Sequence, residues 1–150
     1  MAGTFGYELD VTKLTDEEKD EIKEQIRVFH QFYDLIQYGD YYRLLSPNTG
    51  CSAWEFVSSD GKEALINMVH NRVQANASIP QVKIRGLVDN AFYQVHVKGG
   101  EMLPDFAKKV FPFLDGSLLV SGAALKNGGL PVLPVWHDYQ CWQYHITLQV

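Results

Sequence analysis

The sequence has 150 residues, of which 46% are hydrophobic, which is enough for one domain with a core of its own. Its formal net charge of −5 argues against a nucleic-acid backbone or an anionic membrane surface as a partner, because both bind basic patches. The 13 Lys and Arg residues are scattered and form no run. We therefore expect no nucleic-acid partner and no membrane partner.

The two cysteines, Cys51 and Cys141, are too few to define a disulfide framework, and neither has a metal-binding spacing. Two separate core thiols in a reducing cytosol are the simplest interpretation, with a disulfide bridge as the alternative. The first residues show no basic region followed by an apolar run, and no stretch approaches the roughly 18 apolar residues of a membrane span. These features predict a cytoplasmic protein without a signal peptide.

The chain is predicted to begin with a strand over residues 4–10, followed by its only long helix over residues 15–38. Thr15 and Glu18 have the spacing of a capping box, and Gly39 predicts a left-handed end. Apolar residues recur at steps of three and four on one helix face: Ile22, Ile26, Phe29, Tyr33 and Ile36, widened by Val28, Phe32 and Leu35. So broad an apolar face must pack against the rest of this chain or against something outside it.

After Gly39 the hydrophobic pattern changes to the period of two that is typical of strands. Strands are predicted over residues 41–45, 52–58, 63–73, 82–85, 93–97 and 139–150, and residues 117–125 are predicted to be a strand that runs into a glycine turn. Asp60 and Gly61 between two alternating runs predict an antiparallel hairpin. Residues 99–115 are predicted to be irregular with one short amphipathic turn, and residues 126–134 to form a loop. The last strand alternates so clearly that one face should be buried and the other wet.

Short strands with turns between them predict a mainly β fold, namely an antiparallel β-sandwich of Greek-key type preceded by one long α-helix. The opening βα unit does not fit this pattern, because such units belong with parallel strands. It has no neighbouring strand to pair with in this chain. We therefore expect that the sequence begins inside a larger fold, with one unit over residues 1–39 and a second over residues 40–150.

Residues 3–10, 12–15 and 17–19 resemble the end of the catalytic barrel in α-galactosidases of glycoside hydrolase family 36. Residues 38–44, followed by Ser46 and Pro47, resemble the junction of this family into its C-terminal domain. Weaker matches are Ala53, Trp54, Val57, Ser58, Ala64, Leu65 and Leu87. The chain departs from the family in residues 121–130, where Ala123 and Ala124 replace an acidic pair.

The resemblance implies that residues 4–10 are the eighth strand of a (β/α)₈ barrel, residues 15–38 its outer helix and residues 41–150 a β-sandwich beside it. Such enzymes are retaining hydrolases of terminal α-galactosyl groups in melibiose and raffinose-type oligosaccharides. Their catalytic aspartates lie on earlier barrel strands, which this sequence lacks, so we expect no catalysis by this chain alone. The expected partners are the catalytic barrel of the parent, α-galactoside oligosaccharides through that parent, and further copies in a homo-oligomer.

Two groups of residues are candidates for a site. Glu8 and Asp10 share one face of a predicted strand, but retaining glycosidases need paired carboxyl groups about 5–5.5 Å apart, and hydrogen bonding or capping is the role we expect for these two. Trp136 and Tyr139 after a proline-bounded loop, together with Trp54, have aromatic faces that can stack on a sugar or fill a core or domain interface. We name these three as candidates for substrate binding.

We predict no catalytic residue, no metal site and no cofactor in this chain. Cys141 and His145 share a strand face but lie about 13 Å apart, too far for one zinc ion. No phosphate loop or nucleophile elbow is present. The alternative function is a free-standing carbohydrate-binding or protein-interaction module. Such a module would enclose the whole apolar face of its helix, whereas part of a larger enzyme would leave it open.

Overall fold

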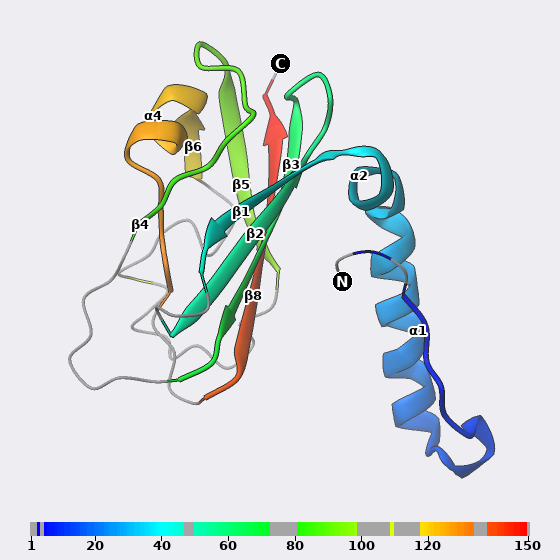
Figure 1. The fold of residues 1–150 in the computed structure, drawn as a ribbon. Helices are drawn as coiled ribbons and strands as arrows, with labels where there is room; N and C mark the ends of the chain where they lie inside the picture. Colours follow the sequence, from blue (N-terminus) through cyan, green and yellow to red (C-terminus); the bar gives the residue numbers. More distant parts are fainter. Residues whose placement is uncertain are drawn as a thin grey trace.

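The computed structural model describes residues 3, 5–46, 50–72, 81–98, 109, 118–133 and 138–149. The helices are the 3₁₀ helix η1 (Val11–Lys13) and the α-helices α1 (Asp16–Gln31), α2 (Tyr33–Tyr38) and α4 (Gly122–Asn127). The strands are β1 (Asp40–Leu45), β2 (Cys51–Val57), β3 (Glu63–His70), β4 (Gln81–Val82), β5 (Phe92–Lys98), β6 (Leu118–Ser121), β7 (Leu130–Pro131) and β8 (Gln140–Leu148). Figure 1 shows the strands gathered in one body, with α1 standing away from it.

Six strands form one antiparallel sheet in the order β1-β2-β3-β8-β5-β6, and β4 and β7 form a second antiparallel sheet. The predicted hairpin is confirmed, because β2 and β3 pair with Trp54 opposite Asn67. The last strand, β8, lies between β3 and β5, so neighbours in the sheet are not neighbours in the chain. The predicted antiparallel β-sandwich is confirmed.

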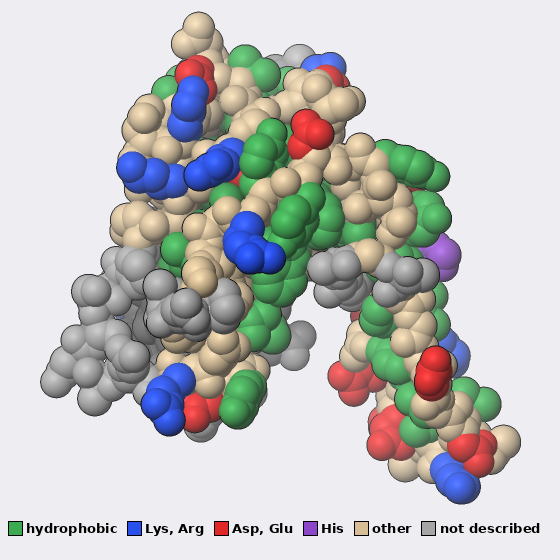
Figure 2. All heavy atoms as spheres, viewed as in Figure 1, with side chains coloured by type: hydrophobic (Ala, Val, Ile, Leu, Met, Phe, Trp, Pro, Cys, Tyr) green, Lys and Arg blue, Asp and Glu red, His purple; other side chains and the backbone are tan. Residues whose placement is uncertain are grey.

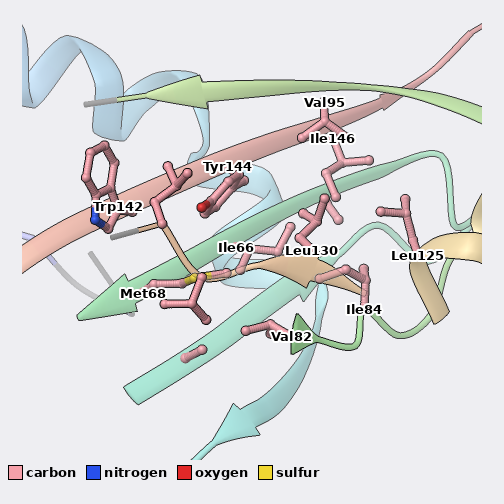
Figure 3. Packing of buried hydrophobic residues seen from close by; sticks show 14 of the residues in the cluster. Ile66, Met68, Val82, Ile84, Val95, Leu125, Leu130, Trp142, Tyr144 and Ile146 are labelled. Carbon is pink, nitrogen blue, oxygen red and sulfur yellow. The ribbon is translucent and has the colours of Figure 1, made fainter. Parts of the chain in front are cut away.

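The main core lies between the large sheet and the layer that contains β4, β7 and α4 (Figure 3). Along β8 the buried side chains alternate with more exposed ones, as the period of two predicts. The buried members are Trp142, Tyr144 and Ile146 of β8, Ile66 and Met68 of β3, and Ile84, Leu125, Leu130 and Leu133 of the covering layer. The buried face predicted for the last strand is therefore confirmed.

Helix α2 packs on the opposite face of the large sheet. Its cluster consists of Phe29, Phe32, Leu35, Ile36, Phe56 and Leu65. The Phe32 ring lies edge-on to His145 of β8, with centroids 4.8 Å apart. This face of β8 is therefore partly covered by α2 and is not simply wet, as the alternation of the strand had suggested.

The predicted single helix over residues 15–38 is in fact two helices, because the backbone departs from helical angles at Phe32, with φ −106° and ψ 10°. The start is as predicted: Thr15 Oγ1 accepts from the Glu18 N–H at 3.2 Å, and the Glu18 carboxylate accepts from the Thr15 N–H at 2.8 Å. The end is different. Gly39 has φ −73° and is extended, not left-handed.

Glycine is required at position 39 because of close backbone packing. A Cβ there would lie 2.4 Å from the Leu35 carbonyl oxygen and 2.8 Å from the Val57 carbonyl oxygen. Both neighbours are backbone atoms, which cannot swing aside as a flexible side chain can. Gly39 therefore lets the end of α2 lie directly against the end of β2.

The predicted strand over residues 4–10 is wrong in this chain, because residues 5–10 are not in a strand. The physical reason is that a lone extended segment has no ladder partner here. The strand predicted over residues 117–125 ends at Ser121, which caps α4 by accepting from the Ala124 N–H at 3.2 Å.

The strand predicted over residues 82–85 is replaced by β4, in which Gln81 and Val82 form the described strand pairs. Their partners are residues 130–131 of the predicted loop, which form β7. The amphipathic turn predicted within residues 99–115 falls outside the described residues, except for helical Lys109.

Candidate functional site

An apolar groove lies between α1 and the segment that precedes it. The Phe5 ring lies 5.2 Å from that of Phe29 and is edge-on to Tyr7 at 5.2 Å, while the Tyr7 hydroxyl donates to Gln25. The groove has a volume of about 350 Å³. Its lining residues are Phe5, Gly6, Tyr7, Leu9, Val11, Ile22, Ile26, Phe29 and His30. The extended segment therefore lies along the apolar face of α1 without closing it.

The apolar side chains of this groove remain open to solvent. Val11 is 60% exposed, Leu9 43% and Ile26 39%. Figure 2 shows hydrophobic side chains along this arm of the molecule, interleaved with acidic ones. Exposed apolar side chains that line one groove make this side of α1 a candidate interaction surface. We call residues 5–11 together with α1 the arm, and its apolar side the open groove.

The polar side of α1 is built from ion pairs one turn apart. Their N–O distances are 3.0 Å for Lys19 and Asp16, 2.7 Å for Lys23 and Asp20, and 2.6 Å for Arg27 and Glu24. These pairs are solvent-exposed and contribute little to stability. They identify this side of α1 as the solvated one and the open groove as the side made for contact.

The arm does not fold back over the sandwich. Figure 1 shows α1 projecting away from the sheet, with α2 between α1 and the sheet. Leu35 and Ile36 of α2 are buried against Phe56 and Leu65 of the sheet, whereas Phe29 is the single buried residue of α1. The enclosed apolar face expected of a free-standing module is therefore not what this fold has.

The two aromatic candidates that the structure describes, Tyr139 and Trp54, do not form one platform. Tyr139 is 79% exposed, in a turn before β8 with a φ of 61°. Trp54 is half-buried against the α2 cluster, and its indole N–H is buried with no hydrogen-bond partner among the described residues. The strand register places Trp54 of β2 opposite Asn67 of β3, and Asn67 opposite Gln143 of β8. Tyr139 precedes Gln143 by four residues, so it lies about 13 Å along the sheet from the row that contains Trp54. Trp136 falls outside the described residues, and sugar contact by any of the three stays a prediction.

The carboxylates of the arm have structural surroundings. Asp10 Oδ1 accepts from the Thr12 hydroxyl at 2.6 Å and from the Thr12 N–H at 3.1 Å, which caps η1. The hydrogen bond from the Thr12 side chain is the main cause that lowers the pKa of Asp10. Glu8 is exposed to solvent. Asp10 thus has the capping role that we expected of it.

The described ranges contain no group of three or more His, Cys, Asp or Glu placed to hold a metal ion. Cys51 and Cys141 do not form a disulfide, but Cys141 is exposed and so is not the core thiol that the sequence suggested. Burial raises the pKa of the Cys51 thiol to about 11. Within the described part of the chain no helix has both the length and the apolar character that a bilayer span requires.

Sequence reasoning overlooked Glu55, the most unusual ionisable residue of the fold. Its side chain is fully buried on the core face of β2, which also presents Ala53 and Val57. The Arg85 N–H donates to Glu55 Oε1 at 2.8 Å, while Oε2 has no hydrogen-bond partner in the described chain. Burial raises the pKa of Glu55 to about 8, so the carboxyl is mostly protonated at pH 7. The signal that could have found it is the period of two in β2, which places Glu55 on the same face as Ala53 and Val57.

Two family models match the sequence. The glycosyl hydrolase family 36 C-terminal domain matches residues 51–146, and the melibiase family matches residues 1–39. The chain belongs to glycosyl hydrolase family 36. This family 36 chain is 36% identical over 148 residues to the bifunctional α-galactosidase/sucrose kinase AgaSK of Mediterraneibacter gnavus. The aligned region covers 98% of the chain and 14% of AgaSK.

The family 36 chain is also 43% identical over 107 residues to the α-galactosidase AgaA of Geobacillus stearothermophilus, covering 69% of the chain and 15% of that enzyme. The crystal structure of AgaA matches it with a TM-score of 0.80 at 30% identity, covering 99% of the chain and 18% of the structure. A variant of AgaA in complex with raffinose matches with a TM-score of 0.79, at the same identity and coverage. The chain therefore spans 14–18% of these relatives and corresponds to their C-terminal region.

Proposed function

We propose that this chain is the C-terminal region of an α-galactosidase that hydrolyses terminal α-galactosyl residues of melibiose and raffinose-type oligosaccharides with retention. In this proposal residues 1–39 complete a catalytic (β/α)₈ barrel, and residues 40–150 form the β-sandwich that supports it. The chain is not catalytic by itself. Support comes from its relatives, of which it spans a small part, and from the variant of AgaA that was crystallised in complex with raffinose.

The open groove of the arm is the observation that carries the proposal. An outer barrel helix must bury its apolar face against neighbouring helices and strands, and the strand before it must pair with a neighbour on each side. The arm has such a face at Ile22 and Ile26, and residues 5–10 are extended but unpaired. The catalytic barrel of the parent is therefore the proposed partner, with α-galactosides as its substrates.

The joint at α2 explains how a sandwich can support a barrel. Phe32, Leu35 and Ile36 anchor α2 to the sheet, and Gly39 brings the end of α2 against the Val57 carbonyl. Whatever packs in the open groove is thereby held at a fixed position relative to the sandwich. We infer a cytoplasmic location from Cys51 and Cys141, two thiols that are not joined in a disulfide. Assembly into homo-oligomers stays a prediction.

A chimera tests this function directly. The chain replaces the matching C-terminal region of AgaA, and hydrolysis of a chromogenic α-galactoside is measured for the chimera, for AgaA without that region and for the chain alone. We expect the chimera to be active and the other two to be inactive. Turnover by the chain alone, or an inactive but folded chimera, would contradict the proposal.

The open groove can be tested in the same chimera with two matched glutamine variants of α1. Ile26→Gln places a polar amide in the groove, whereas Lys23→Gln places the same amide on the solvated side. We expect Ile26→Gln to lower the thermal stability and the activity of the chimera and Lys23→Gln to leave both nearly unchanged. Equal effects of the two variants would mean that the groove is not a contact surface.

A further inference from the structure

A second groove lies on the sandwich, between the segment that follows β4 and helix α4. It has a volume of about 470 Å³ and is lined by Lys83, Ile84, Arg85, Gly86, Leu87 and Lys126. Figure 2 shows basic side chains gathered on this part of the surface, over α4 and the segment after β4. The chain as a whole has a net charge of −5, so this local cluster of cations differs from the rest of the molecule in the sign of its charge. We call it the cationic groove.

The cations of this groove are only partly neutralised. Lys126 pairs with Asp89, its ammonium lying 3.0 and 3.1 Å from the two carboxylate oxygens. Lys83 and Arg85 are exposed, and within the described ranges neither side chain has an acidic partner in salt-bridge distance. They alternate with buried Val82 and Ile84, so both project from the same side of the segment. The groove therefore has a surplus of two positive charges.

The backbone beneath these cations is held in place from several sides. The Arg85 N–H donates to buried Glu55 at 2.8 Å, and the Ile84 N–H donates to the Leu125 carbonyl at 3.1 Å. The Tyr93 hydroxyl accepts from the Val88 N–H at 2.9 Å and donates to the Gly61 carbonyl at 2.7 Å. A charged groove on a fixed backbone loses little conformational entropy when a ligand binds. The backbone that carries these cations is thus preorganised.

We propose that the cationic groove binds a dianionic oxyanion, either inorganic phosphate or the phosphate group of a small monoester. The surplus of two charges matches a phosphate group, which carries about −1.5 to −2 at pH 7. The guanidinium of Arg85 provides the planar fork that pairs with two oxyanion oxygens, while Lys83 and Lys126 act as point charges on either side. Half-buried Leu87 adds an apolar side chain against which the organic part of a monoester can lie.

The test is a titration of the chain with sodium phosphate at pH 7 and constant ionic strength, followed by amide NMR. We expect saturable shifts of the amides of residues 84–87 and of Lys126, with a dissociation constant in the millimolar range or tighter, of order 1 mM. A parallel titration with glucose 6-phosphate distinguishes the two sources of phosphate: tighter binding assigns the groove to monoesters, and equal binding assigns it to the phosphate group alone. No saturation by either ligand overturns the proposal.

Three variants make the test specific. The double variant Lys83→Ala with Arg85→Ala should weaken binding by at least about tenfold, because charge-assisted hydrogen bonds are lost. Asp89→Asn should strengthen it, because the competing carboxylate is removed from Lys126. The control, Lys13→Ala with Lys23→Ala, removes two exposed cations from the arm and should leave binding unchanged. Equal weakening by both double variants would mean non-specific charge attraction and would overturn the proposal.

Discussion

The arm and the sandwich contain similar apolar side chains but bury them to different extents. In β3, Ala64, Leu65, Ile66 and Met68 are each 0% exposed, because the sheet is covered on both faces. In α1 only Phe29 is buried, and Ile26 keeps 39% of its surface in water. The sandwich thus has a closed hydrophobic core of its own, whereas the apolar face of the arm is mostly left uncovered. Burial, more than hydrophobic content, identifies the part of the chain that is made for a partner.

The largest expected effect separates the two regions by stability. Ile66→Ala should lower the free energy of unfolding by about 2–5 kcal/mol, because it leaves a cavity in the closed core of the sandwich. Ile26→Ala should cost less than about 1 kcal/mol in this chain, because its side chain is already in contact with water. Urea unfolding followed by tryptophan fluorescence measures both. If the two variants cost the same, the arm is packed as tightly as the sandwich.

The second effect concerns pH and belongs to the sandwich alone. Glu55 has a pKa raised by burial from 4.5 to about 8, so the folded chain holds a proton that the unfolded chain releases between these values. The free energy of unfolding should therefore fall as pH rises through this window, by about 1.4 kcal/mol per pH unit at most. Above about pH 8 the contribution of this group to the slope vanishes, since both states are then ionised.

Two glutamine variants isolate the contribution of Glu55. Glu55→Gln keeps an oxygen for the Arg85 N–H and stays neutral, so it should flatten the fall in stability between pH 5 and pH 8. Glu17→Gln changes an exposed carboxylate of the arm and should leave the slope as it is. Urea unfolding at several pH values gives the answer. An unchanged slope in Glu55→Gln would show that this carboxyl is ionised in the folded chain.

The sequence was sufficient for features that depend on local pattern. The structure has three features that residues close together in the sequence predict: the alternation of β8, the hairpin at Asp60 and Gly61, and the cap at Thr15. The sequence does not reveal the cap of α4 at Ser121, because the glycine and two alanines that follow it predict a strand that runs into a glycine turn. That error had a local cause too.

Other features depend on contacts that no local pattern contains. At the break between α1 and α2, the Phe32 ring contacts His145 of β8, which is far away in the chain. Gly39 was expected to be left-handed, yet its lack of a side chain serves a close approach to Val57. The cationic groove needs Lys126 beside Lys83 and Arg85, a neighbourhood that only the folded topology creates. Candidate sites built from several elements are therefore found in the structure and not in the sequence.

The third effect tests the joint between the two regions. Gly39→Ala should lower the free energy of unfolding by about 1–3 kcal/mol, because the new Cβ would meet the carbonyl oxygens of Leu35 and Val57. Gly6→Ala in the arm is the matched control, since a Cβ there meets nothing within 4 Å, and its cost should stay within about 0.5 kcal/mol. Thermal unfolding monitored by circular dichroism compares the two. A harmless Gly39→Ala would mean that α2 can move off β2 at little cost.

The smallest effect asks whether the arm and the sandwich unfold together. Thr15→Ala removes the hydroxyl that accepts the Glu18 N–H at 3.2 Å and should cost α1 about 1 kcal/mol. Because α1 shares little core with the sheet, hydrogen exchange should quicken in the first turns of α1 and stay unchanged in β3 and β8. Thr15→Ser keeps the cap and should restore slow exchange. If protection in β3 falls as well, the arm and the sandwich form one cooperative unit, and the stability of the sandwich depends on the helix that stands away from it.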